Sequence, residues 1–159
     1  MNYPKKILPW IQGKEIQSSS RKFFPKIAPA AGRVIAQVAR GTARDARQAV
    51  NSALKAFPAW SALSVVTRGE ILRQAVLVIE KRRKELVAII ALESGKSRQA
   101  AEAEISAAIE CGYFFAGEGR RFYGEVLPSA APNRHVELRR ESLGVGVLVT
   151  PFNNPAAGI

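Results

Sequence analysis

The chain is poor in cysteine, histidine and acidic residues. Its 159 residues include one Cys, one His and 13 Asp or Glu, against 24 Lys or Arg. A single cysteine, Cys111, excludes an internal disulfide framework. His135 has no companion Cys or carboxylate at metal-ligand spacing, so we interpret it as a surface histidine and predict no metal site. These shortages exclude disulfide-rich folds and histidine-based metal centres.

Long hydrophobic runs are also missing. The longest clear run, Leu86 to Leu92, is far shorter than the roughly 18 residues that span a membrane. The segment from Met1 to Lys6 lacks the apolar core of a secretory signal. We therefore expect no membrane association and a cytoplasmic location. The 47% hydrophobic content is enough for one domain with a modest core.

The shortage of acidic residues gives a net charge of +11. Residues 1–60 hold eleven Lys or Arg and two acidic residues, so most of the excess lies in the first third of the chain. Such a region could belong to a basic nucleic-acid-binding module. Its charges are scattered singly, however, and no aromatic-studded basic strand accompanies them. We favour a solvated basic surface over nucleic acid as a partner.

The chain reads as strands, then helices, then strands. Short runs punctuated by Pro and Gly between Lys5 and Val38 predict a small antiparallel layer. Thr42 followed by Asp45 predicts a capping box at the start of a helix. That helix carries one apolar stripe that we expect to be buried, made of Ala46, Ala49, Val50, Ala53, Leu54 and Phe57.

Two further helical stretches follow. We expect Pro58-Ala-Trp60 to end the first helix and Thr67 with Glu70 to begin the second. The basic run Lys81 to Lys84 indicates a solvated helix junction rather than a phosphate site. A long helix from about Ser97 to Phe122 should bury Ala101, Ile105, Ala108, Ile109 and Phe115.

Two glycine motifs do not have the spacing of nucleotide sites. Gly95-Lys96-Ser97 resembles the end of a phosphate-binding loop, but Ile90 stands where that loop needs its first glycine. Gly95 instead predicts a helix C-cap. Gly144-Val-Gly146 precedes a strand instead of following one, so it predicts a turn.

The last fifteen residues carry the clearest functional pattern. The apolar run from Val145 to Val149 predicts a parallel strand buried on both faces. Pro151 cannot continue a ladder and Pro155 suits a first helical turn, so residues 152–154 predict a strand-to-helix turn. In an open α/β sheet such a turn lies where ligands bind. We therefore expect a candidate active-site loop here.

This segment, Thr150-Pro-Phe-Asn-Asn-Pro155, resembles the Thr-Pro-Trp-Asn-Phe-Pro signature of the NAD(P)-dependent aldehyde dehydrogenase superfamily. Six further motifs resemble the family's in its order: Trp10 to Gly13, Ala28 to Val38, Ala56 to Trp60, Thr67 to Leu72, Leu92 to Lys96 and Gly117 to Glu125. The resemblance implies an α/β fold that is truncated. It would comprise β-hairpins and a helical layer over residues 1–124, an oligomerisation arm over 125–143, and the first strand and turn of a Rossmann-like nucleotide-binding sheet over 144–159.

The resemblance also implies roles for residues of the last turn. Asn153 matches the signature asparagine, whose amide would stabilise the oxyanion formed when a thiolate attacks an aldehyde. The alternative is that Asn153 only caps the following helix. Val149, Thr150 and Phe152 would line the cleft for NAD or NADP, the first two mainly through their backbone. Phe152 replaces the usual Trp, and Asn154 replaces the usual Phe.

Other parts of the family's machinery are not found in these 159 residues. They contain no Cys in the nucleophile setting, no Glu-Leu-Gly-Gly base motif and no Gly-x-Thr-x-x-Gly phosphate segment. Cys111 we interpret as a structural thiol. Oxidation of a small aldehyde would therefore be the work of a parent oxidoreductase, and we expect no tight cofactor binding by this chain. The arm implies a homo-oligomer or, as an alternative, a non-catalytic assembly subunit that associates with a longer homologue.

Overall fold

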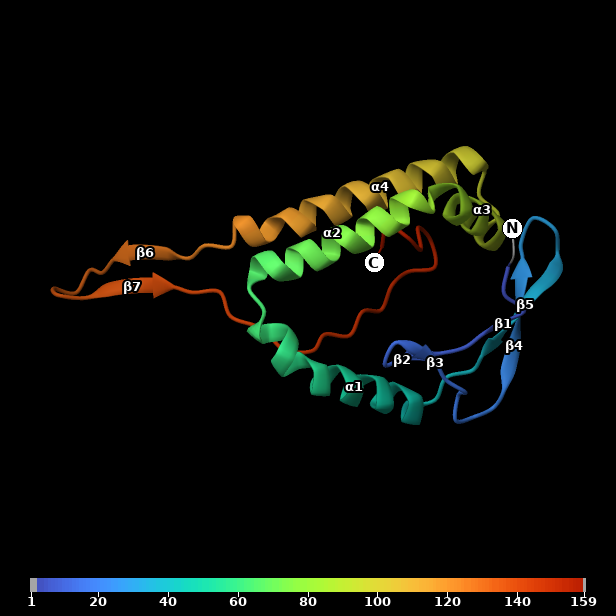
Figure 1. Ribbon diagram of the computed structural model, residues 1–159, viewed down its shortest axis with the longest axis horizontal. Helices are drawn as coiled ribbons and strands as arrows, with labels where there is room; N and C mark the ends of the chain where they lie inside the picture. Colours follow the sequence, from blue (N-terminus) through green and yellow to red (C-terminus); the bar gives the residue numbers. More distant parts are fainter. Residues whose placement is uncertain (1–2, 159) are drawn as a thin grey trace.

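The computed structural model describes residues 3–158 and begins with two small sheets (Figure 1). Strands β1 (Lys6–Ile7), β4 (Phe23–Ala28) and β5 (Arg33–Ala39) form one sheet in the order β1-β5-β4. β4 and β5 are antiparallel, but β1 pairs parallel with β5, so the expectation of a purely antiparallel layer is wrong. β2 (Trp10–Ile11) and β3 (Lys14–Glu15) form a tight hairpin. Its turn residues, Gln12 and Gly13, both have positive φ, as a two-residue hairpin turn requires.

Helix α1 (Ala43–Ala62) begins at the predicted capping box. The Thr42 hydroxyl accepts from the Asp45 amide, and the Asp45 carboxylate accepts from the Thr42 amide at 2.9 Å. The same carboxylate also accepts from the Ser19 amide and the Ser18 hydroxyl. These bonds tie the loop before β4 to the start of α1. The Ser19 amide foremost, with Ser18 and Thr42, outweighs the effect of burial and lowers the pKa of Asp45 well below its usual range.

The rest of α1 differs from the expectation. The helix does not end at Pro58 but continues to Ala62, with Pro58 inside it. The apolar stripe is mostly uncovered: Leu54 is 52% exposed, and only Phe57 is half-buried. α1 packs chiefly against the small β2 strand, so little in the described part of the chain covers the stripe.

Three helices form the packed part of the molecule: α2 (Val65–Lys81), α3 (Arg83–Ser94) and α4 (Arg98–Gly117). Ser64, three residues before the expected Thr67, caps α2 because its hydroxyl accepts from the Thr67 amide at 3.0 Å. The predicted basic junction lies between α2 and α3. The predicted C-cap at Gly95 is also confirmed, with a left-handed φ of 73°.

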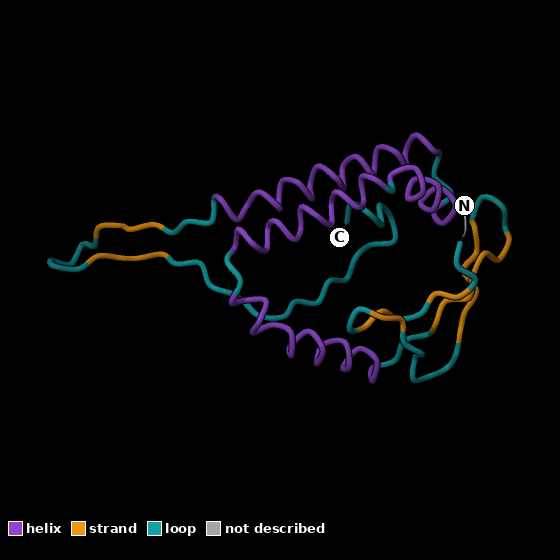
Figure 2. The backbone as a smooth tube through the Cα atoms, viewed as in Figure 1, coloured by secondary structure: helices purple, strands orange, loops and turns teal. Residues whose placement is uncertain are grey.

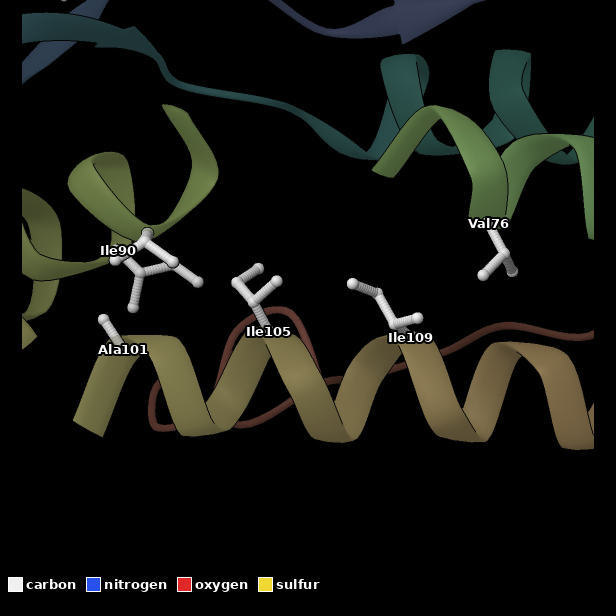
Figure 3. Close-up of a cluster of buried hydrophobic side chains, with 6 residues drawn as sticks. Val76, Ile90, Ala101, Ile105 and Ile109 are labelled. Atoms are coloured by element: carbon white, nitrogen blue, oxygen red, sulfur yellow. The ribbon is translucent and has the colours of Figure 1, made fainter. Parts of the chain in front are cut away.

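The core lies between these helices and consists of Val76, Val87, Ile90, Ala101, Ile105 and Ile109 (Figure 3). Glycines allow α2 and α4 to approach closely: a Cβ on Gly69 would lie 2.4 Å from the Ala116 carbonyl oxygen. Burial was predicted correctly for three α4 residues, but Ala108 is only half-buried and Phe115 is 60% exposed. α4 also ends at Gly117, five residues before the expected Phe122, and a short 3-10 turn, η1 (Glu118–Arg120), follows.

Beyond η1 the chain leaves the helical layer. Strands β6 (Glu125–Pro128) and β7 (His135–Leu138) form an antiparallel hairpin that projects from the body, as the tube view makes plain (Figure 2). Residues 139–150 then return toward the helices without regular secondary structure (Figure 1). The buried strand expected over 145–149 is therefore wrong: Val149 is 94% exposed, because the described residues supply no parallel strand to pair with it. Among residues 3–158, no helix is both long and apolar enough to cross a membrane.

Candidate functional site

The turn that carries the signature asparagine lies against the helical layer. Ala156 packs against the core cluster, and the loop passes α4 near Ile105 (Figure 3). The Gly158 amide donates to the Asn154 carbonyl at 3.0 Å and closes a turn. Residues 155–158, the last that the structure describes, form a turn. The alternative role of Asn153 as the cap of a following helix stays a prediction.

A buried carboxylate on α4 fixes this turn. Glu104 is only 6% exposed, and its Oε1 accepts from the Ala156 amide at 2.8 Å. Its Oε2 accepts from the Lys96 ammonium at 2.7 Å, and Lys96 also donates to the side-chain oxygen of Asn154. Burial alone would raise the pKa of Glu104, but the Lys96 and Ala156 hydrogen bonds, with the charge of Lys96, hold it below its usual value.

The predicted site residues lie next to this anchor and are open to solvent. Val149, Thr150, Phe152 and Asn153 are all exposed, Phe152 by 97%. They lie in one irregular stretch, and the Asn153 amide has no side-chain hydrogen bond to any described residue. Asn154 stands where the family has Phe, and Lys96 holds it by a hydrogen bond to its side chain. Its φ of 51° is left-handed, a conformation that asparagine tolerates better than most residues.

An apolar groove of about 720 Å³ lies beside the turn, between α2, α3 and α4 and residues 155–158. Cys111 lines this groove and is exposed. His135 is exposed on β7, as expected, 3.4 Å from Glu137. Within the described residues no group of three or more His, Cys, Asp or Glu could hold a metal ion.

Comparison with known proteins identifies the family of this chain. The aldehyde dehydrogenase family profile matches residues 16–159. The chain belongs to the aldehyde dehydrogenase family. It is 35% identical over 147 residues to a D-glyceraldehyde dehydrogenase (NADP(+)) of Thermoplasma acidophilum, an alignment that covers 92% of this chain and 30% of that protein.

Solved structures agree with this assignment. A crystal structure of an Escherichia coli NADP-dependent enzyme matches with a TM-score of 0.89 and 30% identity, over 98% of this chain and 32% of that one. A betaine aldehyde dehydrogenase from Staphylococcus aureus, solved in complex with NAD+, matches with a TM-score of 0.72 and 28% identity over 78% of this chain and 25% of its own. The chain therefore has the α/β fold of a portion of an aldehyde dehydrogenase and spans about 30% of the length of its relatives.

Lys96 and Glu104 are the site residues that sequence reasoning missed. The sequence places Lys96 in the family-like motif from Leu92 to Lys96 but indicates no role for its side chain. A signal was nevertheless available at Glu104, because it stands next to Ile105 and three residues after Ala101 on the buried face of a helix. A carboxylate in that position must find hydrogen-bond donors or a cation, since burying it unpaired is costly.

Proposed function

We propose that this chain is the amino-terminal portion of an NAD(P)-dependent aldehyde dehydrogenase that oxidises a small aldehyde to a carboxylic acid. One observation carries the proposal: the signature asparagine lies on a turn that is hydrogen-bonded to the helical layer through Glu104. The family membership and the close match in backbone to an NADP-dependent enzyme support it. A cytoplasmic location stays a prediction from the sequence.

Asn153 is the residue of this chain that we assign to the chemistry. Its side-chain NH₂ is an exposed donor with no described side-chain partner, next to a residue that Lys96 holds. Such a donor suits the oxyanion that forms when a thiolate adds to the aldehyde carbon, and losing one such donor typically costs about 2.7 to 4 kcal/mol of barrier. A nicotinamide cofactor held beside Val149, Thr150 and Phe152 would supply the hydride acceptor. We assign no nucleophile in this chain, because no base among residues 3–158 is hydrogen-bonded to Cys111.

Val149, Thr150 and Phe152 fit one wall of a cofactor cleft. The backbone groups of Val149 and Thr150 form no hydrogen bonds with the rest of the described chain, so they are free to bind a polar ligand. The Phe152 ring offers a flat apolar surface beside them. All three residues are exposed. That this chain alone does not bind NAD or NADP tightly stays a prediction.

The proposal includes the division into residues 1–124, 125–143 and 144–159, with the middle part as an oligomerisation arm. The projecting β6–β7 hairpin supports it, since its apolar side chains Val126 and Leu138 are exposed and its edges are unpaired. The same hairpin favours a second candidate function, an assembly subunit that pairs with a longer homologue.

We expect size-exclusion chromatography to give oligomers, and a variant lacking residues 125–138 to elute as a smaller species. A monodisperse monomer at all concentrations would contradict the arm.

Spectrophotometry of NAD(P)H formation tests the proposed reaction. The longer protein that contains this chain should oxidise a small aldehyde with stoichiometric cofactor reduction, whereas residues 1–159 alone should show neither turnover nor tight cofactor binding. Saturable turnover by residues 1–159 that survives Cys111→Ser would contradict the proposal. Turnover that Cys111→Ser abolishes would instead make Cys111 the nucleophile.

A further inference from the structure

We propose that Lys96 and Glu104 are positioning residues that hold Asn153 in its catalytic place, an inference that rests on the proposed function. Among the described residues, neither side chain forms a hydrogen bond with Asn153. They act through Asn154 and Ala156, the residues one and three positions after it. The pair would therefore determine where the Asn153 amide points without taking part in the reaction.

The buried carboxylate selects the docked turn because it has two separate acceptor atoms to satisfy. Lys96 occupies Oε2 at 2.7 Å, and the Ala156 amide occupies Oε1 at 2.8 Å. If the turn moved away, Oε1 would lose a charge-assisted hydrogen bond, which is stronger than one between neutral groups. Glu104 thus favours the one arrangement of the turn that returns the Ala156 amide to it.

Lys96 is itself held in a fixed place. It lies in the short link between α3 and α4, flanked by Gly95, which caps α3, and Ser97, whose hydroxyl accepts from the Ala100 amide and caps α4. Its ammonium bridges Glu104 and the side-chain oxygen of Asn154. One cation therefore joins the helical layer to the residue adjacent to Asn153.

The two tethers restrict Asn153 because both are made within the three residues that follow it. Consecutive Cα atoms are about 3.8 Å apart, so fixing Asn154 leaves Asn153 little freedom of position. The Gly158 to Asn154 hydrogen bond closes the turn further. An oxyanion donor needs this restriction, since a misplacement of about 1 Å can cost roughly 10²-fold in rate.

A double-mutant cycle in the longer dehydrogenase tests the inference. We expect Lys96→Met to lower kcat/KM for the aldehyde by roughly 10- to 100-fold. In the Asn153→Ala background the same change should cause almost no further loss, because both changes remove the same contribution, the hydrogen bond from Asn153 to the oxyanion. Arg83→Met is the matched control: it removes the 2.8 Å ion pair between Arg83 and Glu102, also between α3 and α4, and should leave kcat/KM within about twofold.

The cycle separates the two levels of the proposal. Full activity of Lys96→Met beside an impaired Asn153→Ala would overturn the positioning role alone, as would losses that simply multiply in the double variant. An unchanged kcat/KM of Asn153→Ala would overturn the oxyanion assignment and, with it, the positioning of that residue.

Amide exchange in the 159-residue chain gives a second test that does not depend on activity. Lys96→Met and Glu104→Gln should each speed exchange of the Ala156 amide by at least about tenfold, because the charge-assisted bond to Glu104 is weakened. Exchange in the middle of α4 should stay slow, which shows that the helix remains folded, and Arg83→Met should change neither. If the Ala156 amide exchanged at an unchanged rate in both variants, Lys96 and Glu104 would not hold the turn in place.

Discussion

The helices α2 to α4 and the segment 139–153 contain similarly apolar residues but reach opposite outcomes. Val76, Ile105 and their neighbours are buried, whereas Val147, Leu148 and Val149 are exposed. A helix satisfies its backbone hydrogen bonds internally, and here its packing partners are present in the same chain. A central strand takes both its hydrogen bonds and its cover from other strands and helices. The difference shows that apolar pattern alone does not bury a segment.

Truncating one side chain in each region should give the sharpest contrast. We expect Ile105→Ala to lower the free energy of unfolding by about 2 to 5 kcal/mol, since it leaves a cavity in the core. Leu148→Ala should change it by less than about 0.5 kcal/mol, because the side chain is already exposed. Urea denaturation followed by far-UV circular dichroism measures both. Equal losses of stability would mean that the two regions do not differ in packing.

Adding a methyl group should show the same contrast more weakly. A Cβ at Gly69 would meet the Ala116 carbonyl oxygen at 2.4 Å, whereas a Cβ at Gly146 would meet nothing within 4 Å. We expect Gly69→Ala to destabilise by about 1 to 3 kcal/mol despite the higher helix propensity of alanine. Gly146→Ala should be neutral in the same denaturation experiment. A stabilised Gly69→Ala would mean that α2 and α4 are less tightly packed than they appear.

The capping box of α1 offers an intermediate case, because this helix has a defined start but a largely exposed stripe. Thr42→Ala should cost about 1 kcal/mol, the usual loss for an N-cap hydroxyl. Thr42→Ser, which keeps the acceptor oxygen, should recover most of that loss in thermal unfolding. If both variants lost the same amount, the hydroxyl bond to the Asp45 amide would not matter.

The stability of the chain should also depend on pH through Asp45. Its pKa is lower in the folded chain than in the unfolded chain. The stabilisation by its charged form is therefore fully present above the ordinary Asp pKa of about 3.9, and is lost as the pH falls through the folded value. Asp45→Asn should be less stable than the unaltered chain at pH 7, and the gap should narrow at pH 3. If the stability difference between the two proteins grew as the pH fell, it would contradict the lowered pKa of Asp45.

Sequence patterns predicted elements whose determinants are local. The Thr42 and Asp45 box and the Gly95 cap each depend on a few neighbouring residues, and both form. Expectations that depended on distant partners were wrong, notably the buried strand before Thr150 and the covered stripe of α1. Cover from other segments cannot be read from a local periodicity.

The candidate site divides in the same way. The asparagine turn could be located from the proline spacing and from the family resemblance. The anchor could not, because it joins Lys96 and Glu104 to a backbone amide 52 residues after Glu104. Only the fold brings these groups together. The buried carboxylate alone gave a hint, as a charge that needed donors which the local sequence does not supply.

The most direct test of the account is to measure kcat/KM and the thermal midpoint of Asn153→Ala in the longer dehydrogenase. The account predicts that kcat/KM for the aldehyde falls by roughly 10²-fold or more while the midpoint and the cofactor affinity stay nearly constant, because the contact forms chiefly in the transition state. An unchanged kcat/KM, with or without a lower midpoint, would contradict the assignment of Asn153 to the chemistry.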